Sequence, residues 1–332
     1  MTNEPMTAAR PELGLAGPAQ ANPRTRRWLR RGTRPSNDVE KPLPLGRQLI
    51  VQAILIFITA SVLFPLVWIV SMSLDPRNLS RPDGLNLIPP GATLDAYIAV
   101  INRPTSNPID FLGLTLNSLK IAVASSVIAV LLGVTAAYAF SRLRFRGREA
   151  LMIAVLGVLM LPSVATIIPL FIFLNQFQIE FGDLEFNLRA SLIGVTLAVI
   201  SAQLPFAIWN LKGYLDTIPR DLEEAAAVDG ATQNQIFRKV VLPLAIPAIA
   251  VTGFLGFLGG WTEYLTVAMF LTDTSDWTLS LALNSLVGQF ARTTNWSHFA
   301  AFAVLFALPI SVVFFVFQRY LVGGLAVGGV KG

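Results

Sequence analysis

Few side chains in this sequence could carry out covalent, redox or metal chemistry. The chain of 332 residues has no cysteine and a single histidine, His298. A thiol nucleophile, a disulfide framework and a multi-histidine metal site are therefore excluded. None of the five lysines is followed by serine or threonine, so the phosphate-binding P-loop pattern is missing as well. We expect the chain to have no catalytic residue, no metal ligands and no cofactor of its own.

The residues with the most specific spacing lie in a polar stretch between two long apolar segments. Pro219 suits a helix start, and Gly230 suits a helix end because glycine adopts positive φ without a steric penalty. Thr232 followed by Gln235 is a capping-box pair that begins a second helix, and Pro243 is expected to end that helix before the fifth span. The stretch is thus predicted to form two short helices joined at Gly230. The spaced pattern itself comprises Glu224, Ala225, Ala226, Gly230, Val240, Leu242 and Pro243.

One carboxylate, Glu263, lies beside an apolar run, where an ionised side chain costs at least about 2.5 kcal/mol unless it faces protein or water. Two interpretations stay open. Glu263 is either a satisfied carboxylate at a helix end or inside the bundle, or a polar group lining a solute path. The neighbouring Trp261 and Tyr264, together with Asn284, are candidate solute contacts. Aromatic residues at this depth also serve as packing or interface anchors.

The composition places these residues in a membrane protein. The chain is 54% apolar and 14% charged, with a mean hydropathy of +0.61, whereas soluble domains carry about 25% charged residues. A spanning helix needs about 20 apolar residues, and six charge-free runs reach that length. They lie between Arg47 and Asp75, Lys120 and Arg142, Glu149 and Glu180, Arg189 and Lys212, Lys239 and Glu263, and His298 and Arg319.

Arginines assign the orientation of the predicted spans. Loop 141–148 carries four arginines, which places it in the cytoplasm. Loop 75–110 has no positive excess and loop 180–189 is net acidic, so both are expected outside. Both termini and the loop at 212–243 are then cytoplasmic. We interpret the arginines that precede the first span as a cytoplasmic flank and not as a nucleic-acid site, because no folded basic module surrounds them. They are Arg24, Arg26, Arg27, Arg30, Arg31 and Arg34.

The chain divides into four predicted segments. Residues 1–45 are expected to be a disordered basic cytoplasmic tail, since they lack apolar periodicity. Residues 46–112 hold the first transmembrane helix and an external loop. Residues 113–319 form the transmembrane core and include the loop at 215–243, and residues 320–332 are a Gly-rich cytoplasmic tail.

Two local features are expected within these segments. Residues 274–290 are predicted to form a short amphipathic helix at the outer face. Pro162, Pro169 and Pro309 lie inside apolar runs, where proline removes a backbone hydrogen bond and kinks a helix.

The spaced loop pattern resembles the "EAA" signature of permeases of type I ATP-binding-cassette (ABC) importers, with Val240 in place of the usual isoleucine. The flanking segments 209–214 and 218–223, and Pro247, are similar to that family as well. Elsewhere, segments 117–119 and 136–142 resemble the carbohydrate-uptake branch, and the ending 323–332 is similar to maltose-type permeases. The resemblance covers residues 46–332. It implies an all-α integral membrane protein with six transmembrane helices and the type I ABC importer permease fold.

The resemblance also implies how the loop at 215–243, here named the coupling loop, would work. Its first helix would dock in a groove of a separate ATPase subunit and move with that groove when ATP closes the ATPase pair. Glu224 would make a polar contact at the groove rim. Ala225 and Ala226 would permit close approach, and Gly230 would set the angle between the two helices, with Leu242 and Pro243 completing the motif.

The implied partners are a second, similar permease subunit, two ATP-binding subunits that hold ATP and magnesium, and an extracytoplasmic sugar-binding protein. Membrane lipid surrounds the bundle, and no nucleic acid is expected. The implied location is the cell (inner, cytoplasmic) membrane. The C-terminal resemblance favours an α-glucoside such as maltose, a maltodextrin or trehalose.

Two other classes of protein are weighed against an importer permease. An ion-coupled secondary transporter usually needs intramembrane carboxylates, and this chain offers little besides Glu263. A non-transporting scaffold or receptor has no reason to contain the spaced pattern from Glu224 to Pro243. For a loop without that spacing, an amphipathic hairpin that only packs against the bundle would be the default interpretation.

Overall fold

The computed structural model describes residues 44–78, 87–181, 184–287 and 294–328, with the backbone alone at 179–181, 184–186 and 321–328. Of the predicted tail at 1–45, only residues 44 and 45 are therefore described. The last four residues of the predicted tail at 320–332 lie outside the described residues. The chain divides into two compact units, residues 1–61 and 62–332. In the first unit, residues 45–61 form the start of a helix with every side chain exposed.

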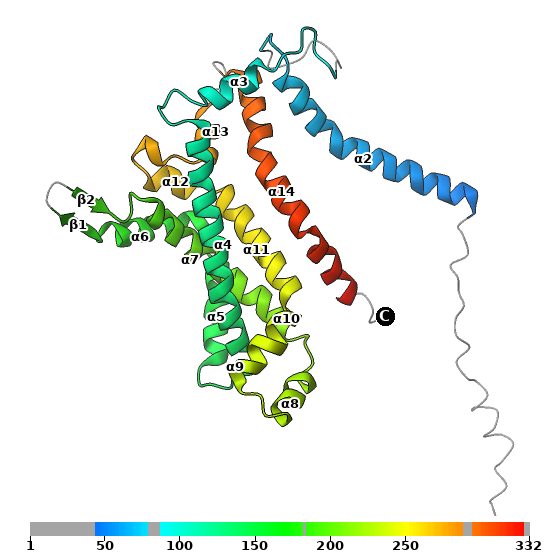
Figure 1. Cartoon of the computed structure of the whole chain (residues 1–332), viewed down its shortest axis with the longest axis vertical. Coiled ribbons are helices and arrows are strands. Elements are labelled where there is room, and N and C mark those ends of the chain that lie inside the picture. Colours follow the sequence, from blue (N-terminus) through cyan, green and yellow to red (C-terminus); the bar gives the residue numbers. More distant parts are fainter. Residues whose placement is uncertain (1–43, 79–86, 182–183, 288–293, 329–332) are drawn as a thin grey trace, which may run out of the picture. The chain divides into compact units, whose positions relative to one another are not determined.

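The described part is mostly helical, and its elements are labelled in Figure 1. The long helices are α2 (Leu45–Ser73), α4 (Phe111–Arg142), α7 (Leu192–Leu215), α11 (Ile246–Trp261) and α14 (Trp296–Gly328). The shorter ones are α3 (Asp95–Asn102), α5 (Arg148–Leu159), α6 (Ser163–Asn175), α8 (Asp221–Val228), α9 (Gln233–Ile236), α10 (Leu242–Leu244), α12 (Leu265–Phe270) and α13 (Leu279–Ser285). A π-helix, η1 (Phe237–Val241), and a 3₁₀ turn, η2 (Thr274–Asp276), complete the helical set.

Four described helices are long and apolar enough to cross a membrane, namely α2, α4, α7 and α14 up to Tyr320. The count rises to six if two bent helix pairs each count as one span. The count of six transmembrane helices and the cytoplasmic location of both termini remain predictions. Helix α14 continues to Gly328, beyond Arg319 where the last apolar run ends.

The third predicted span is the first of these broken pairs. Helices α5 and α6 meet at an angle of 103°. Pro162 lies at the break with an extended backbone, ψ 130°, which follows from its lack of an N–H and its clash with the preceding turn. Pro169 and Pro309 lie inside α6 and α14, which both continue through them. Only one of the three predicted proline sites is therefore a break between helices.

A short antiparallel hairpin departs from the all-α prediction. Strands β1 (Gln178–Phe181) and β2 (Leu184–Asn187) pair with Gln178 opposite Asn187 and Phe181 opposite Leu184. The hairpin occupies the loop that was expected to be external and acidic. Its strands follow α6 directly and lead into α7, so the hairpin links two helices without adding a layer to the bundle.

Helix α4 packs against both α7 and α11 and forms the centre of the second unit. Small residues allow this close approach. A Cβ added at Gly260 of α11 would lie 2.7 Å from Ser125 Oγ and 2.8 Å from Ala122 Cα of α4. Hydrogen bonds join α11 to both neighbours, since Ser126 Oγ of α4 donates to Gly253 O at 2.6 Å and Gln203 Nε2 of α7 donates to Gly256 O at 2.9 Å. The three helices thus form one tightly packed unit.

The helix predicted within 274–290 is shorter than expected and partly buried. It splits into η2 and α13, and Leu279, Ser280 and Ala282 of α13 are buried. Asn117 Nδ2 of α4 donates to the carbonyls of Ser275 and Trp277 at 2.9 and 3.1 Å. These bonds attach the segment to the end of α4. The apolar residues of α13 are therefore buried against the bundle, and the helix does not lie on the outer surface as expected. Residues 288–290 lie outside the described residues.

Candidate functional site: the coupling loop

The coupling loop folds as its spacing predicts, with two short helices joined by a glycine. Helix α8 ends at Val228, and Gly230 has φ +84°, a conformation that costs other L-residues about 1–2 kcal/mol. The Thr232 side chain accepts from the Gln235 backbone, and the Gln235 side chain accepts from the Thr232 backbone. This capping box begins α9, so the predicted helix pair is confirmed.

A nearly buried ion pair attaches α8 to the end of α4. Arg142 Nε donates to Glu223 Oε1 at 2.5 Å, and the two side chains are 6% and 12% exposed. Arg142 Nη2 also donates to the Ile218 carbonyl at 2.9 Å. A second arginine, Arg220, donates to the Ser141 carbonyl at 3.2 Å. The first helix of the loop is therefore fixed to the membrane bundle by charged hydrogen bonds.

A second polar group joins α7 to the same corner. Asp216 accepts from Lys212 Nζ and from Ser141 Oγ, each at 2.6 Å. Burial opposes ionisation of the Asp216 carboxyl, but the hydrogen bonds from Lys212 and Ser141 outweigh burial and lower its pKa. Ser141 also accepts from Arg142 Nη1 at 3.0 Å. The ends of α4 and α7 thus share one continuous set of bonds with α8.

The second half of the loop is held by packing. Gln233 Nε2 donates to the Tyr138 hydroxyl, and the Tyr138 ring lies 4.7 Å from the Phe237 ring, centroid to centroid. Ile236 and Val241 are buried in the same apolar cluster as Leu211 and Leu215 of α7. This cluster packs the loop against the bundle. An amphipathic hairpin that only packs against the bundle would make the same contacts, so the cluster does not distinguish the two interpretations.

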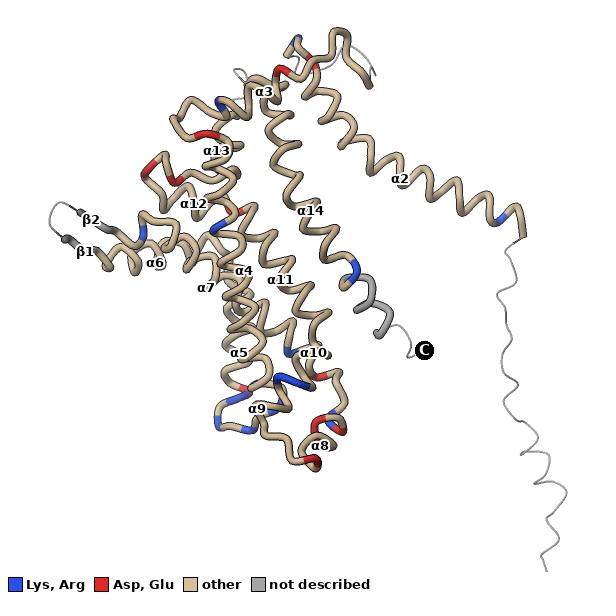
Figure 2. The backbone as a smooth tube through the Cα atoms, viewed as in Figure 1, with Lys and Arg blue, Asp and Glu red and all other residues tan. Residues whose placement is uncertain are grey.

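Charged residues gather around α8 and α9, while α11 has none (Figure 2).

Pro243 does not end the helix, contrary to our expectation. Helix α10 continues through Pro243 to Leu244, and the chain bends by 71° at Ala245 before α11. Proline cannot donate to the carbonyl four residues earlier. The preceding turn is accordingly wide, with Leu242 N–H bonded to the Phe237 carbonyl five residues back. Pro243 therefore follows a π-helix and precedes a bend, and the helix does not end at this proline.

One face of α8 has no partner within the described part of the chain. Glu224 and Ala225 are exposed, whereas Ala226 is half-buried against the bundle. Leu222 and Val228 are 46% and 88% exposed. The spacing of Leu222, Ala225 and Val228 places them along one side of the helix. This apolar strip was missed, although the period of three in the sequence could have revealed it.

The predicted solute contacts lie near the other end of α11, and they differ in exposure. Trp261 is fully buried, and its Nε1 donates to the Phe306 carbonyl at 3.2 Å. Its side chain therefore packs α11 against α14 and presents no surface to a solute in this conformation. Tyr264 and Asn284 are exposed. Ser280, one turn before Asn284 on α13, donates to the Glu263 carbonyl.

Glu263 is a helix-end carboxylate in this structure. Its Oε1 accepts from the Thr266 backbone N–H at 2.8 Å, which satisfies a free donor in the first turn of α12. The side chain is half-exposed, so a second, solute-facing role stays a prediction. In the described part of the chain, no three His, Asp or Glu side chains lie close enough together to hold a metal ion.

Residues 129–327 match the family described as binding-protein-dependent transport system inner membrane component. The chain belongs to this family. It is 37% identical over 279 residues to the maltose/maltodextrin transport system permease protein MalG of Vibrio vulnificus (strain YJ016), covering 82% of this chain and 91% of that protein. It is 35% identical over 297 residues to MalG of Escherichia coli (strain K12), covering 86% and 97%.

Solved structures show the same fold. A chain of a bacterial ABC transporter involved in the import of the acidic polysaccharide alginate superposes with a TM-score of 0.66 at 25% identity, covering 82% of this chain and 95% of that chain. As a binding-protein-dependent permease, the protein is a component of the inner membrane and has the architecture of an ABC importer subunit.

Proposed function

We propose that the chain is the permease subunit of an ATP-driven importer for α-glucosides such as maltose, a maltodextrin or trehalose. The observation that carries the proposal is the exposed face of α8 on a loop that is rigidly fixed to α4 and α7. A helix fixed at its base and bare on its outer face is suited to receive a force from another subunit. Similarity to maltose/maltodextrin permeases over most of the chain supports the substrate class.

The geometry suggests how force would pass into the membrane bundle. A partner ATPase that carries ATP and magnesium would grip Leu222, Ala225 and Val228, with Glu224 at the edge of the contact. Displacement of α8 would be transmitted through the Arg142–Glu223 pair to α4. Because α4 packs on both α7 and α11, a shift of its end would tilt the central helices together. This chain would thus couple ATP hydrolysis by its partners without an ATPase site of its own.

The proposed assembly contains this chain, a second homologous permease, two ATP-binding subunits and an extracytoplasmic sugar-binding protein. The test is the ATPase rate of the reconstituted complex with the binding protein and a panel of sugars. We expect α-glucosides to stimulate hydrolysis, and uptake to persist with proton and sodium ionophores when ATP is maintained. If ionophores abolish uptake under those conditions, an ion-coupled transporter is the better assignment.

A variant series links the assay to α8. Val228→Glu should place a charge on the apolar strip and abolish sugar-stimulated hydrolysis. Val228→Ala, which keeps the strip apolar, serves as the matched control. Copurification of the ATPase with the control and not with the Glu variant would support docking at this face. Equal copurification with both would overturn it.

A further inference from the structure

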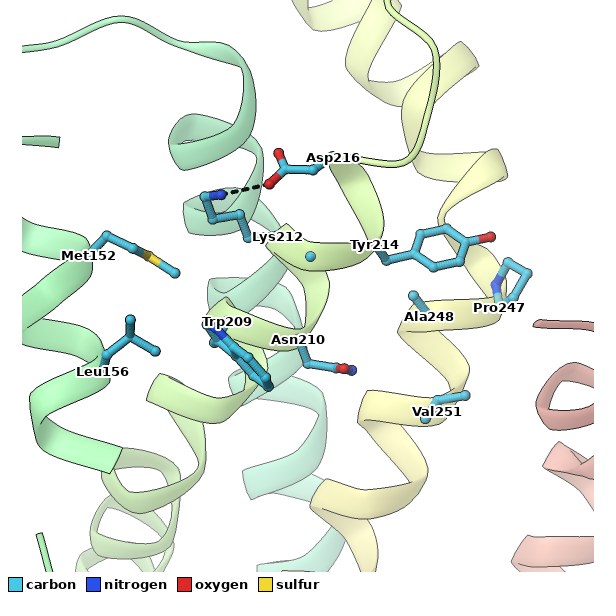
Figure 3. Close-up of a pocket in the computed structure, with 11 residues that line it drawn as sticks. Met152, Leu156, Trp209, Asn210, Lys212, Tyr214, Asp216, Pro247, Ala248 and Val251 are labelled. Carbon is cyan, nitrogen blue, oxygen red and sulfur yellow. Dashed lines mark hydrogen bonds and ion pairs between the residues drawn. The ribbon is translucent and has the colours of Figure 1, made fainter. Parts of the chain in front are cut away.

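Two adjoining cavities lie at the end of α5, α7 and α11 that leads into the coupling loop. The first, of about 730 Å³, lies between α5 and α11 over α7. Figure 3 shows Met152 and Leu156 on one side of it, Trp209 beside them, and Ala248 and Val251 on the far side. The second, of about 700 Å³, adjoins the loop between α4 and α5. Met152 and Lys212 line both cavities, so the two form one continuous trough.

The two ends of the trough differ in chemistry. The walls of the first cavity are mainly apolar, formed by Met152, Leu156, Trp209, Pro247, Ala248 and Val251. The second cavity is lined by Arg144, Arg148 and Lys212, with Glu149 as its one acidic residue. Within the described residues, Arg144 and Arg148 make no ion pair or hydrogen bond through their side chains. An apolar channel therefore opens onto two arginines that lack a partner.

The two acidic groups that line the trough, Asp216 and Glu149, are fewer than its three basic groups, so a positive charge remains in excess. Asp216 is already bonded to Lys212 and to Ser141, each at 2.6 Å. Glu149 lines the same cavity as Arg144 and Arg148 and makes no ion pair within the part of the chain that is described. The rim thus attracts an anion, and the walls beneath it attract a hydrocarbon chain.

We propose that the trough binds an anionic phospholipid. Its phosphate lies on Arg144 and Arg148, and one acyl chain lies along Met152, Leu156 and Trp209. Guanidinium groups bind phosphate oxygens in a bidentate manner, and basic pockets between membrane helices on the cytoplasmic side suit anionic headgroups. Trp209 is half-exposed and lies one turn before Lys212 on α7. This is a position that suits a tryptophan anchor at the membrane interface.

Other occupants fit these walls less well. A free phosphate would leave the apolar cavity unfilled. A sugar needs partners for many hydroxyl groups, but the Asn210 amide already donates to Thr252 Oγ1 at 2.9 Å, and Lys212 is paired with Asp216. The site also lies close to the coupling loop, because Asp216 and Arg142 share Ser141, and Arg142 is paired with Glu223.

The test is quenching of Trp209 fluorescence by lipids brominated on the acyl chain. The full chain, in its complex, is placed in vesicles of phosphatidylcholine that contain brominated phosphatidylglycerol or brominated phosphatidylcholine. The chain has six tryptophans, so the signal of Trp209 is the difference between wild type and Trp209→Phe. We expect phosphatidylglycerol to quench Trp209 at a lower mole fraction than phosphatidylcholine does. Equal quenching by the two lipids would overturn the proposal.

Matched variants in one loop assign the headgroup site. Arg144→Gln and Arg148→Gln should each weaken the preference for phosphatidylglycerol about fivefold, which corresponds to about 1 kcal/mol per arginine. Arg146→Gln is the control, because Arg146 lies in the same loop but lines neither cavity. A loss of the same size for all three variants would mean nonspecific surface attraction and would overturn the site.

A further variant tests the acyl-chain channel. Met152→Trp should fill the junction of the two cavities and abolish the preference while leaving folding intact, as judged by detergent elution profile. Inorganic phosphate should not displace the brominated lipid. Displacement by an α-glucoside, or a cross-link from position 152 to the second permease subunit in every complex, would show a different occupant and refute lipid binding.

Discussion

Arg142 Nε and Glu223 Oε1 lie 2.5 Å apart and join the last residue of α4 to the first turn of α8. Removing one partner from a buried ion pair costs about 3–5 kcal/mol, because the other charge is left uncompensated. This contact is nearly buried and is supported by the Arg142 bond to the Ile218 carbonyl. The position of α8 therefore depends on one pair of side chains 81 residues apart in sequence.

Glu223→Gln should release α8 from α4 while leaving the membrane bundle folded. We expect faster amide exchange over 221–228 and a loss of sugar-stimulated ATP hydrolysis. Glu224→Gln is the matched control, since Glu224 is exposed and lies next to Glu223. It should leave amide exchange unchanged and affect only the contact with the ATPase. Equal exchange rates in the two variants would contradict the anchoring role of Glu223.

Gly230→Asp should insert into the membrane but uncouple ATP hydrolysis from uptake. A Cβ at this position meets nothing within 4 Å, and Asn and Asp both tolerate the left-handed conformation better than other residues. The loop should therefore still fold, and the added charge should act on the docking partner. Gly230→Asn has the same shape without the charge and should retain most of the coupling. Normal uptake by Gly230→Asp would refute this role.

Glu263→Ala should destabilise the start of α12, because the Thr266 N–H loses its acceptor. The expected cost is about 0.5–2 kcal/mol, the range found for helix caps, measurable by thermal unfolding in detergent. Glu263→Gln keeps an acceptor oxygen and should restore most of that stability. If Glu263 also lines the solute path, the Gln variant should fold normally and still change the apparent sugar affinity. Wild-type rate and affinity in both variants would exclude a role in the path.

Gly260→Ala should weaken the packing of α11 on α4, since the new methyl group would overlap Ser125 Oγ and Ala122 Cα. Overpacking of this kind costs about 1–3 kcal/mol. Gly253→Ala, two turns earlier on the same helix, is the control because its nearest neighbour is 3.7 Å away. The unfolding temperature in detergent should fall for Gly260→Ala only. Alanine is the better helix former, so a similar decrease in both variants would mean that the loss does not come from the close contacts at Gly260.

Part of the fold could be predicted from local residue chemistry. Gly230, Thr232 and Gln235 form the expected turn and capping box because those interactions lie within a few residues of each other. The apolar runs likewise gave α2, α4, α7 and α14. The break at Pro162 was less predictable. Three prolines lie in similar apolar runs, and their neighbours decide which of them kinks, tilts or breaks a helix.

Composition and short-range capping need no knowledge of distant contacts, so they were enough to predict the membrane class, the positions of the apolar runs and the two-helix form of the coupling loop. Tertiary structure decided which side of α8 is free, through the pairing of Glu223 with Arg142. It also buried Trp261 against Phe306 and brought Arg144, Arg148 and Lys212 around one trough. Those outcomes depend on how helices far apart in the chain pack together, and neither hydropathy nor local residue spacing carries information about that packing.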